Sequence, residues 1–494
     1  MKIFIVSPYR KNLAVGSDTT SAADCERMDL FPSEAILILT AVLREAGHAV
    51  INRDYTVKSV ASQDNPKKYA QNDALEIIKR ENIKLVGISY LFSGDFDGAC
   101  ELARMIKAEI PDVKIITGGI HPTTFPREIL SNIHDFDYIA IGEGENIIVE
   151  IANRMEKGDM GDLTEIPGFA FRDDNNTVHV NEIRKQVDFD ALPMRAWDTV
   201  NFSDYEMNLE SFFNPKKHDI KCMVSIFSER GCPFQCSFCE LFRLQGRTLR
   251  KRSISKFVDE LQYLVEERGQ RYFRFQDDNL IVDNRHVISL CNEIVKRSLD
   301  IQLDVGGGHV NSYNDDVIDS LHSAGLVSTT LNIEHGSEYM RDKVVKKPIG
   351  RDKIFKVIES LRRYKISIGT NWIMGFPEDT DETLQETYDL INETKADRSN
   401  VGTLVPFPGT PIFDQCVRDD LFIEKIDINE IWRKGFRPNQ GRPVIKPYNM
   451  SVASLLEWRD KFAELRYKYY GHTINELPIP KGFARGVDGA IRPL

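Results

Sequence analysis

Short apolar strands alternate with amphipathic helices in two separate stretches of this 494-residue chain. In the first stretch, segments rich in Ile and Val at Ile3–Val6, Leu85–Ser89 and Lys114–Thr117 are separated by segments with helical spacing, such as Phe96–Glu109. Alternation of this kind is typical of parallel sheets, because a parallel crossover needs about the length of a helix. The pattern predicts a doubly wound, Rossmann-like parallel sheet of about five strands at the amino end.

The second stretch runs from Lys221 to Val405 and contains about six strand–helix units, too few for a closed eightfold barrel. It predicts a partial, TIM-like (β/α)6 barrel. The whole chain is therefore predicted to be an α/β protein. Its expected parts are a Rossmann-like domain at 1–150, a linker at 151–217, the partial barrel at 218–415 and a small, mostly helical C-terminal segment at 416–494.

Composition excludes several classes of protein. The net charge of -11 and the pI near 5.6 argue against a nucleic-acid-binding surface as the main function. No apolar run approaches the roughly 18 residues of a membrane span. Five cysteines are scattered without disulfide-like pairing, which is typical of a reducing cytoplasm. They are Cys25, Cys100, Cys222, Cys291 and Cys416.

The other three cysteines, Cys232, Cys236 and Cys239, follow the first strand of the second stretch with C-x3-C-x2-C spacing. Three thiolates on one tight loop suit three irons of a [4Fe–4S] cube, and the fourth iron is then left without a protein ligand. A zinc knuckle or chance clustering is the alternative. Zinc usually takes C-x2-C pairs and four ligands, yet no Cys or His stands between Leu241 and Val282.

The cysteine spacing, with the aromatic Phe238 just before the last cysteine, resembles the radical S-adenosylmethionine (SAM) superfamily. In that family the amino and carboxylate groups of SAM chelate the free iron. The resemblance implies further SAM contacts at the ends of later strands of the barrel. The residues at those positions are Asp277 and Asp278 after the second strand, Glu334 after the fourth, and Met374 and Gly375 after the fifth.

A purely structural role is the alternative at each of these strand ends. Many radical SAM proteins have a Gly-Gly-Glu-like run where this chain has Asp277-Asp278, so which carboxylate faces SAM is open, and either one is also a candidate helix cap. Glu334 is alternatively a solvated charge or the partner of Lys346 or Lys347. The run Gly306–His309, expected after the third strand, either lets a ligand approach or is only a turn.

Four motifs of the amino-terminal stretch resemble the cobalamin-binding domain of B12-dependent radical SAM enzymes. They are Leu39–Val50, Val86–Ser89, Gly118–Thr124 and Ile141–Glu145, in this order before the cysteines. The resemblance covers roughly residues 1 to 415. The alternative is a domain that keeps this fold and has lost its cofactor.

The resemblance implies cobalamin at the carboxyl-end loops of the first sheet, with Gly94, Gly118, Gly119 and His121 among its contacts. The Asp-x-His-x-x-Gly run that supplies a cobalt-ligating histidine in other B12 proteins is absent. The resemblance therefore implies base-off cobalamin without a histidine on cobalt.

The implied activity is a methyltransferase that places a methyl group on an unactivated carbon, or on phosphorus, of a small metabolite through a 5′-deoxyadenosyl radical and methylcobalamin. Its implied partners are a small-molecule substrate and a one-electron donor such as flavodoxin or ferredoxin. One alternative is cyclisation, rearrangement or dehydration in the same architecture, with or without cobalamin. Another is a non-catalytic iron–sulfur or B12 sensor.

Overall fold

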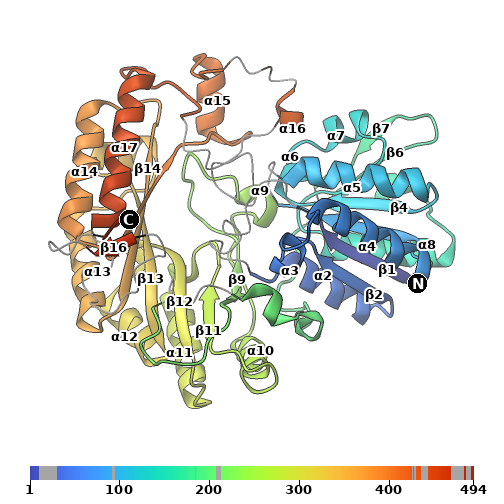
Figure 1. Cartoon of the computed structure of the whole chain (residues 1–494), viewed down its shortest axis with the longest axis horizontal. Coiled ribbons are helices and arrows are strands. Elements are labelled where there is room, and N and C mark those ends of the chain that lie inside the picture. Colours follow the sequence, from blue (N-terminus) through green and yellow to red (C-terminus); the bar gives the residue numbers. More distant parts are fainter. Residues whose placement is uncertain are drawn as a thin grey trace. The chain divides into compact units, whose positions relative to one another are not determined.

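The computed structural model divides the chain into two compact units. Unit 1 comprises 1–206, 240–250 and 426–438, and unit 2 comprises 207–239, 251–425 and 439–494. Each unit is built on its own main sheet (Figure 1). The structure describes residues 1–9, 31–91, 95–183, 185–206, 213–424, 427, 430–434, 443–468, 483–485 and 491–493.

The sheet of unit 1, blue to cyan in Figure 1, has seven strands in the order β2-β1-β3-β4-β5-β6-β7. The first five strands of the chain pair in parallel, which confirms the predicted doubly wound fold. The strands are β1 (Lys2–Ser7), β2 (Ala49–Asp54), β3 (Leu85–Ser89), β4 (Lys114–Gly118), β5 (Tyr138–Ala140), β6 (Phe169–Arg172) and β7 (Val178–Val180).

Strands β6 and β7 extend this sheet beyond the five strands expected, and both pair antiparallel. They arise from a stretch that the sequence predicted to be irregular linker. Phe169 and Phe171 are buried against the core of unit 1, and the side chain of Asp173 accepts hydrogen bonds from the backbone of the turn that follows. Two aromatic residues followed by an Asp-Asp-Asn-Asn turn are therefore the sequence pattern that indicates this β-hairpin.

The core of unit 1 lies where helices α2 and α8 cover one face of the sheet. Ile3 and Ile5 of β1 meet Ile36 of α2 and Ile148 of α8 in one buried cluster. Each such side chain contributes about 1.5–3 kcal/mol when fully buried. The helices of unit 1 are α2 (Glu34–Glu45), α3 (Lys58–Ala61), α4 (Pro66–Glu81), α5 (Phe96–Glu109), α6 (Ile120–Thr124), α7 (Pro126–Asn132), α8 (Glu145–Lys157), α9 (Phe242–Gln245) and α16 (Ile431–Lys434).

The sheet of unit 2 has six strands in the order β15-β14-β13-β12-β11-β8, all paired in parallel. Neighbouring strands in this sheet are consecutive βα units of the chain, as the predicted partial barrel requires. In the described residues no pairing joins β15 to β8, so the sheet is open. Its strands are β8 (Val224–Ile226), β11 (Tyr272–Phe275), β12 (Gln302–His309), β13 (Leu326–Glu334), β14 (Ser367–Met374) and β15 (Arg398–Thr403).

The helices of unit 2 follow the strands as the apolar spacing predicted. Helix α14 shows why: Thr380 and Thr383 form a reciprocal capping box at its start, and Leu384 and Leu390 are buried. The helices are α10 (Ile254–Glu266), α11 (Asn284–Lys296), α12 (Asp315–Ser323), α13 (Arg351–Arg363), α14 (Asp381–Thr394), α15 (Pro411–Arg418) and α17 (Val452–Lys468). Among the described residues there are also four short strands, β9 (Glu229–Arg230), β10 (Arg250–Lys251), β16 (Phe483–Arg485) and β17 (Ile491–Pro493).

The glycine run Gly306–Gly308 lies inside β12, so its expected place after the third strand and the alternative of a turn were both wrong. A Cβ at Gly307 would lie 2.5 Å from Asn332 Nδ2, and one at Gly308 would lie 2.8 Å from the Tyr313 ring. Neighbouring side chains thus lean over this part of the strand, where only glycine leaves them room. The pairing of β12 with β13 shifts register at the same place.

Among the described residues, no helix combines the length and the apolar character that crossing a bilayer requires.

Candidate functional site

The loop after β8 carries Cys232, Cys236 and Cys239 as half-buried thiols without disulfides. Backbone hydrogen bonds fix the middle of this loop from two sides: Ser237 N donates to Val345 O at 3.0 Å, and Ile412 N donates to Ser237 O at 3.2 Å. Burial raises the pKa of Cys236 to about 12, so the bare thiol keeps its proton and a bound metal ion would displace it. The loop therefore presents three metal-ligand candidates on a backbone held in place.

Asp277 and Asp278, which follow β11, both turn toward the backbone that leads into the cysteine loop. Asp277 Oδ1 accepts hydrogen bonds from Ser228 N at 2.8 Å and from Glu229 N at 2.6 Å. Asp278 Oδ2 accepts from Gly231 N at 3.1 Å. The helix-cap alternative for these two residues is wrong, because Asp283 caps the next helix. Both carboxylates instead orient the segment just before Cys232.

Glu229 was not predicted from the sequence. It lies next to Asp277 before the cysteine loop and is more deeply buried than Asp277, with 1% exposure. Neither of its carboxyl oxygens has a hydrogen-bond partner among the described residues, and the same holds for Asp277 Oδ2. Burial raises the pKa of Glu229 to about 9 and that of Asp277 to about 7, and the Asp277 carboxylate adds to the shift of Glu229. The pair therefore keeps a proton at neutral pH.

Glu334 ends β13 in an ion pair with Lys347, whose Nζ lies 2.7 Å from Glu334 Oε1. Both residues are 6% exposed, so the pairing with Lys347 that the sequence left open is present, but it is buried rather than solvated. The positive charge of Lys347 lowers the pKa of the Cys236 thiol, which partly offsets the larger increase caused by burial. At His309 the same charge and burial both lower the pKa. His309 in turn stacks on Phe234 of the cysteine loop, with 4.3 Å between ring centroids.

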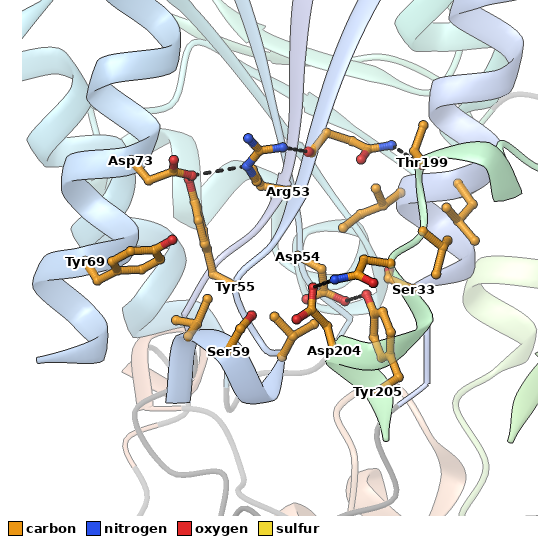
Figure 2. Close-up of a pocket in the computed structure, with 17 residues that line it drawn as sticks. Ser33, Arg53, Asp54, Tyr55, Ser59, Tyr69, Asp73, Thr199, Asp204 and Tyr205 are labelled. Atoms are coloured by element: carbon orange, nitrogen blue, oxygen red, sulfur yellow. Dashed lines mark hydrogen bonds and ion pairs between the residues drawn. The ribbon is translucent and has the colours of Figure 1, made fainter. Parts of the chain in front are cut away.

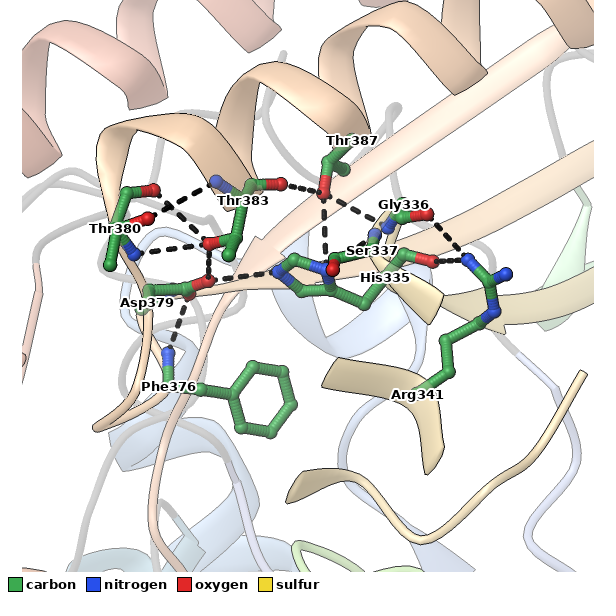
Figure 3. Close-up of polar contacts among 10 residues, drawn as sticks. His335, Gly336, Ser337, Arg341, Phe376, Asp379, Thr380, Thr383 and Thr387 are labelled. Atoms are coloured by element: carbon green, nitrogen blue, oxygen red, sulfur yellow. Dashed lines mark hydrogen bonds and ion pairs between the residues drawn. The ribbon is translucent and has the colours of Figure 1, made fainter. Parts of the chain in front are cut away.

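The loops after β13 and β14 are joined by a buried His335–Asp379 pair, which Figure 3 shows. His335 Nδ1 accepts from Ser337 N at 3.1 Å, so Nε2 is assigned the proton and donates to Asp379 Oδ1 at 2.9 Å. Asp379 Oδ2 accepts from Gly375 N at 2.7 Å. This network, also missed from sequence, fixes the two motifs that were predicted to contact SAM through Glu334 and through Met374 and Gly375.

Of the remaining predicted residues, Met374 and Gly375 are buried in unit 2, whereas Phe238 of the cysteine loop is half-buried. Met374 is 1% exposed at the end of β14. Gly375 has a φ of +88°, a conformation that favours glycine. Phe238 packs edge-on against Phe376, with ring centroids 6.4 Å apart. Phe238 thus links the cysteine loop to the loop after β14.

In unit 1, the glycines that end β4 are explained by the close approach of another loop. Gly119 has a φ of +128°, and a Cβ there would lie 1.9 Å from Tyr90 O. A Cβ at Gly118 would lie 3.4 Å from Ala140 O, at the inner limit of ordinary contact. The packing against Tyr90 therefore explains why glycine occupies position 119, whether or not Gly119 also contacts cobalamin as predicted. Gly94 lies outside the described residues.

His121, the fourth predicted cobalamin contact, is 2% exposed. Its ring centroid lies 4.9 Å from that of Phe96 and 5.3 Å from that of Phe125. Burial lowers its pKa to about 4, so the imidazole is neutral. The structure places this ring inside an aromatic cluster of unit 1 rather than at an open edge.

A cavity of about 240 Å³ opens at the carboxyl end of β2 (Figure 2). Its polar side chains are paired with one another: Tyr205 Oη donates to Asp54 at 3.0 Å, while Arg53 and Tyr55 both donate to Asp73 at 3.2 and 2.8 Å. Asp54 is the last residue of β2, so the cavity lies at a carboxyl end of the parallel strands. The cavity shows that this edge of unit 1 is hollowed and polar.

Two family models match the chain, one in each main sheet. The model of the B12 binding domain matches residues 30–152, and that of the radical SAM superfamily matches residues 227–391, which include the cysteine loop. The chain therefore carries a B12 binding domain followed by a radical SAM domain. The fold class and the family implied by the sequence are thereby confirmed.

Three proteins illustrate what the chain is similar to. The anaerobic magnesium-protoporphyrin IX monomethyl ester cyclase of Cereibacter sphaeroides is 27% identical over 72% of this chain, which spans 55% of that relative. The cytidylyl-2-hydroxyethylphosphonate methyltransferase of Streptomyces wedmorensis is 24% identical over 77% of both chains. The methyltransferase TsrM of Kitasatospora setae shares the fold, with a TM-score of 0.67, 18% identity and coverage of 92% of this chain and 82% of its own.

The two matched domains are those of cobalamin and radical SAM chemistry, and among the similar structures TsrM holds cobalamin and a [4Fe–4S] cluster while OxsB holds cobalamin and SAM. The residues present fit these cofactors. Three half-buried thiols share one loop of unit 2 for the cluster, and a buried carboxylate and ammonium lie near Cys236 for the charged end of SAM. In unit 1 a Cβ at Gly142 would meet nothing within 4 Å, so the edge after β5 has room for a ligand.

Proposed function

We propose that this enzyme is a methyltransferase that places a methyl group on an unactivated carbon, or on phosphorus, of a small metabolite. One observation carries the proposal: a B12 binding domain at residues 30–152 precedes a radical SAM domain at residues 227–391. When bound, the cluster and SAM supply the radical and cobalamin supplies the methyl group. The similarity to a phosphonate methyltransferase over 77% of the chain supports this outcome.

The residues of unit 2 serve this reaction by holding the cysteine loop and the strand ends in fixed positions. Asp277 and Asp278 orient the backbone before Cys232. The His335–Asp379 pair keeps the loops after β13 and β14 together. We assign Glu334, Met374 and Gly375 to SAM contact on this basis, and Phe238 to packing behind the cluster. A preorganised site of this kind lowers the cost of orienting the reacting groups.

In unit 1 we assign Gly118, Gly119 and the loop after β5 to the cobalamin edge. Thr123 Oγ1 accepts from Gly142 N at 2.9 Å, so the loops after β4 and β5 form one surface. The burial of His121 among aromatic rings supports cobalamin bound without this histidine on cobalt. Held at this edge, cobalamin would supply the methyl group that the proposed reaction transfers.

The second candidate function is radical cyclisation in the same architecture. It is favoured by the similarity to an anaerobic cyclase at 27% identity over 366 residues. Its cofactors are the same, so the products of SAM distinguish the two functions. A one-electron donor of the flavodoxin or ferredoxin kind is part of either proposal, since the cluster needs an electron for each cleavage of SAM.

The test uses the full chain reconstituted with iron, sulfide and hydroxocobalamin, then reduced with dithionite in the presence of SAM and candidate metabolites. Mass spectrometry should find 5′-deoxyadenosine, S-adenosylhomocysteine and a product heavier by one methylene. 5′-Deoxyadenosine without S-adenosylhomocysteine would contradict methyl transfer and support cyclisation. Absence of both with every substrate would contradict both functions.

A further inference from the structure

A short segment of unit 1 interrupts the chain of unit 2 directly after the cysteine loop. Residues 240–250 belong to unit 1, whereas the chain on either side of them belongs to unit 2. Helix α9 begins at Phe242, three residues after Cys239, the last of the three cysteines. Three steps of chain span at most about 10 Å. The position of α9 therefore restricts where the backbone of Cys239 can lie.

The other end of this segment is tied to the start of the cysteine loop. Arg250 is the last residue of the segment, and two residues later Arg252 N donates to Ser228 O at 2.9 Å. Ser228 stands four residues before Cys232, the first of the three cysteines. A displacement of segment 240–250 therefore strains the cysteine loop from both of its ends.

Within unit 1, the guanidinium of Arg250 holds this segment. Its Nη1 donates to Glu143 Oε2 at 2.8 Å and to Val187 O at 2.9 Å, and its Nη2 donates to Gln245 O at 2.8 Å. Glu143 Oε2 also accepts from Val187 N at 2.9 Å. The Glu143 and Arg250 side chains are 5% and 14% exposed, so salt and water screen this ion pair little.

The same segment also packs against the loop after β4. Helix α9 lies against helix α6, which follows Gly118 and Gly119 at the end of β4 (Figure 1). Gly246, just after α9, has a φ of +74°, and a Cβ there would lie 1.5 Å from Gln186 Nε2. Glu143 stands in the loop after β5. Both loops that we assign to the cobalamin edge therefore hold segment 240–250 in place.

A buried ion pair adds little stability by itself, because the cost of removing both charges from water largely cancels their attraction. The Glu143–Arg250 pair instead joins the loop after β5 to a segment that continues directly from the cysteine loop. We propose that Glu143 and Arg250 form a positioning pair that couples cobalamin binding at the loops of unit 1 to retention of the cluster by the cysteine loop.

The coupling is entropic in origin. Once cobalamin holds the loops after β4 and β5, segment 240–250 is held with them, and the cysteine loop has less conformational freedom to lose when it binds the cluster. By linkage, the bound cluster favours cobalamin binding to the same extent. The inference rests on the proposed function for the presence of both cofactors, and it holds for methyl transfer and cyclisation alike.

Arg247 provides a matched control within the same segment. It is exposed, and its guanidinium lies 4.2 Å from the centroid of the Phe242 ring. An Arg247→Met substitution removes the same charge and leaves the buried pair intact. The test variants are Arg250→Met and the double variant Glu143→Gln/Arg250→Met, which removes both buried charges and leaves neither partner uncompensated.

The experiment measures how fast the full-length protein with a reconstituted cluster loses iron to EDTA, with and without saturating hydroxocobalamin. Elemental analysis after timed exposure gives the half-time of iron loss, and cobalamin titration verifies saturation of each variant. Hydroxocobalamin should lengthen the half-time at least about fivefold in the wild type and in Arg247→Met, which is the lower end of coupling between two sites. In both Arg250 variants this ratio should fall toward one.

A ratio in the double variant that equals that of the wild type overturns the proposal. Faster iron loss by the same factor with and without cobalamin also overturns it, because the pair then has only a structural role. If Arg250→Met does not assemble its cluster, the double variant decides alone.

The readout needs no turnover, so it is independent of the products found in the test of function. A wild type that binds cobalamin but gives a ratio of one overturns the coupling and leaves the proposed function standing. A wild type that binds no cobalamin overturns both.

Discussion

The carboxyl edges of the two parallel sheets are built on different physical principles. In unit 1 the edge is shaped by steric fit: Gly119 leaves room for Tyr90 O, and His121 is neutral among aromatic rings. In unit 2 the same edge is held by buried polar and ionic side-chain pairs, among them Glu334–Lys347 and His335–Asp379. A glycine-to-alanine substitution, which adds a methyl group, should therefore destabilise the edge of unit 1 most. An isosteric substitution that removes a charge should instead weaken the function of the edge of unit 2.

The largest effect is expected at the metal-ligand candidates. Changing Cys236 to Ala removes the ligand of one iron, so we expect loss of the cluster and of 5′-deoxyadenosine formation, with most of the fold retained. Iron analysis and product assay measure this. Cys291→Ala is the matched control, because Cys291 is a buried thiol of helix α11. A Cys236→Ala protein with about four irons and full SAM cleavage would refute the ligand assignment.

The steric character of unit 1 is tested by two neighbouring glycines. Gly119→Ala should destabilise unit 1 by about 3 kcal/mol, because its Cβ would collide with Tyr90 O in a backbone conformation that favours glycine. Gly118→Ala should cost far less, since its Cβ would lie 3.4 Å from Ala140 O. Denaturant unfolding and retention of cobalamin after gel filtration measure both. Equal effects of the two substitutions would contradict the steric account.

The electrostatic character of unit 2 is tested by an isosteric change. Asp379→Asn keeps the shape of the side chain but removes the charge that accepts from His335, Gly375 and Phe376. We expect SAM affinity to fall about tenfold while cobalamin retention is unchanged. Asp389→Asn, on the exposed face of helix α14 that follows Asp379 in the chain, is the control. Weaker cobalamin binding in Asp379→Asn would show that the network acts beyond the loops of unit 2.

The protonated acid pair predicts a pH dependence of stability. The pKa of Glu229 rises from 4.5 to about 9 on folding, so between these values the folded state binds more protons than the unfolded state. The free energy of unfolding therefore falls as pH rises through this window, by about 1 kcal/mol per unit. Glu229→Gln should flatten this slope in denaturant titrations from about pH 5 to 9. A variant with the wild-type slope would place the buried proton elsewhere.

The smallest effect is expected at the cavity of unit 1. Tyr205→Phe removes one hydrogen bond to Asp54, which keeps its bonds from Thr56. We expect a loss of about 1 kcal/mol in the free energy of unfolding and no change in SAM affinity. Thermal unfolding and the SAM binding assay measure the two quantities. A loss of SAM affinity in Tyr205→Phe would contradict the claim that the cavity of unit 1 and the SAM site of unit 2 act independently.

The sequence by itself determined most of the alternating strands and helices and their order, but not the hairpin of β6 and β7. The apolar spacing predicted β3 at Leu85–Ser89 and α5 at Phe96–Glu109 with the bounds that the structure shows. Periodicity and capping are local, so a single chain segment carries the whole signal. The same holds for the cysteine loop, whose three thiols lie within eight residues, Cys232 to Cys239. The family and its cofactors followed from these local patterns.

The tertiary structure alone decided how the strand ends are used. His335 and Asp379 are 44 residues apart, and Ser228 and Asp277 are 49 apart, so no local pattern pairs them. Lys346 and Lys347 are adjacent and identical in sequence, yet only Lys347 is buried against Glu334. The reason is physical: burial and charge pairing depend on which loops meet at the edge of a sheet, and that meeting is set by the packing of strands distant in the chain.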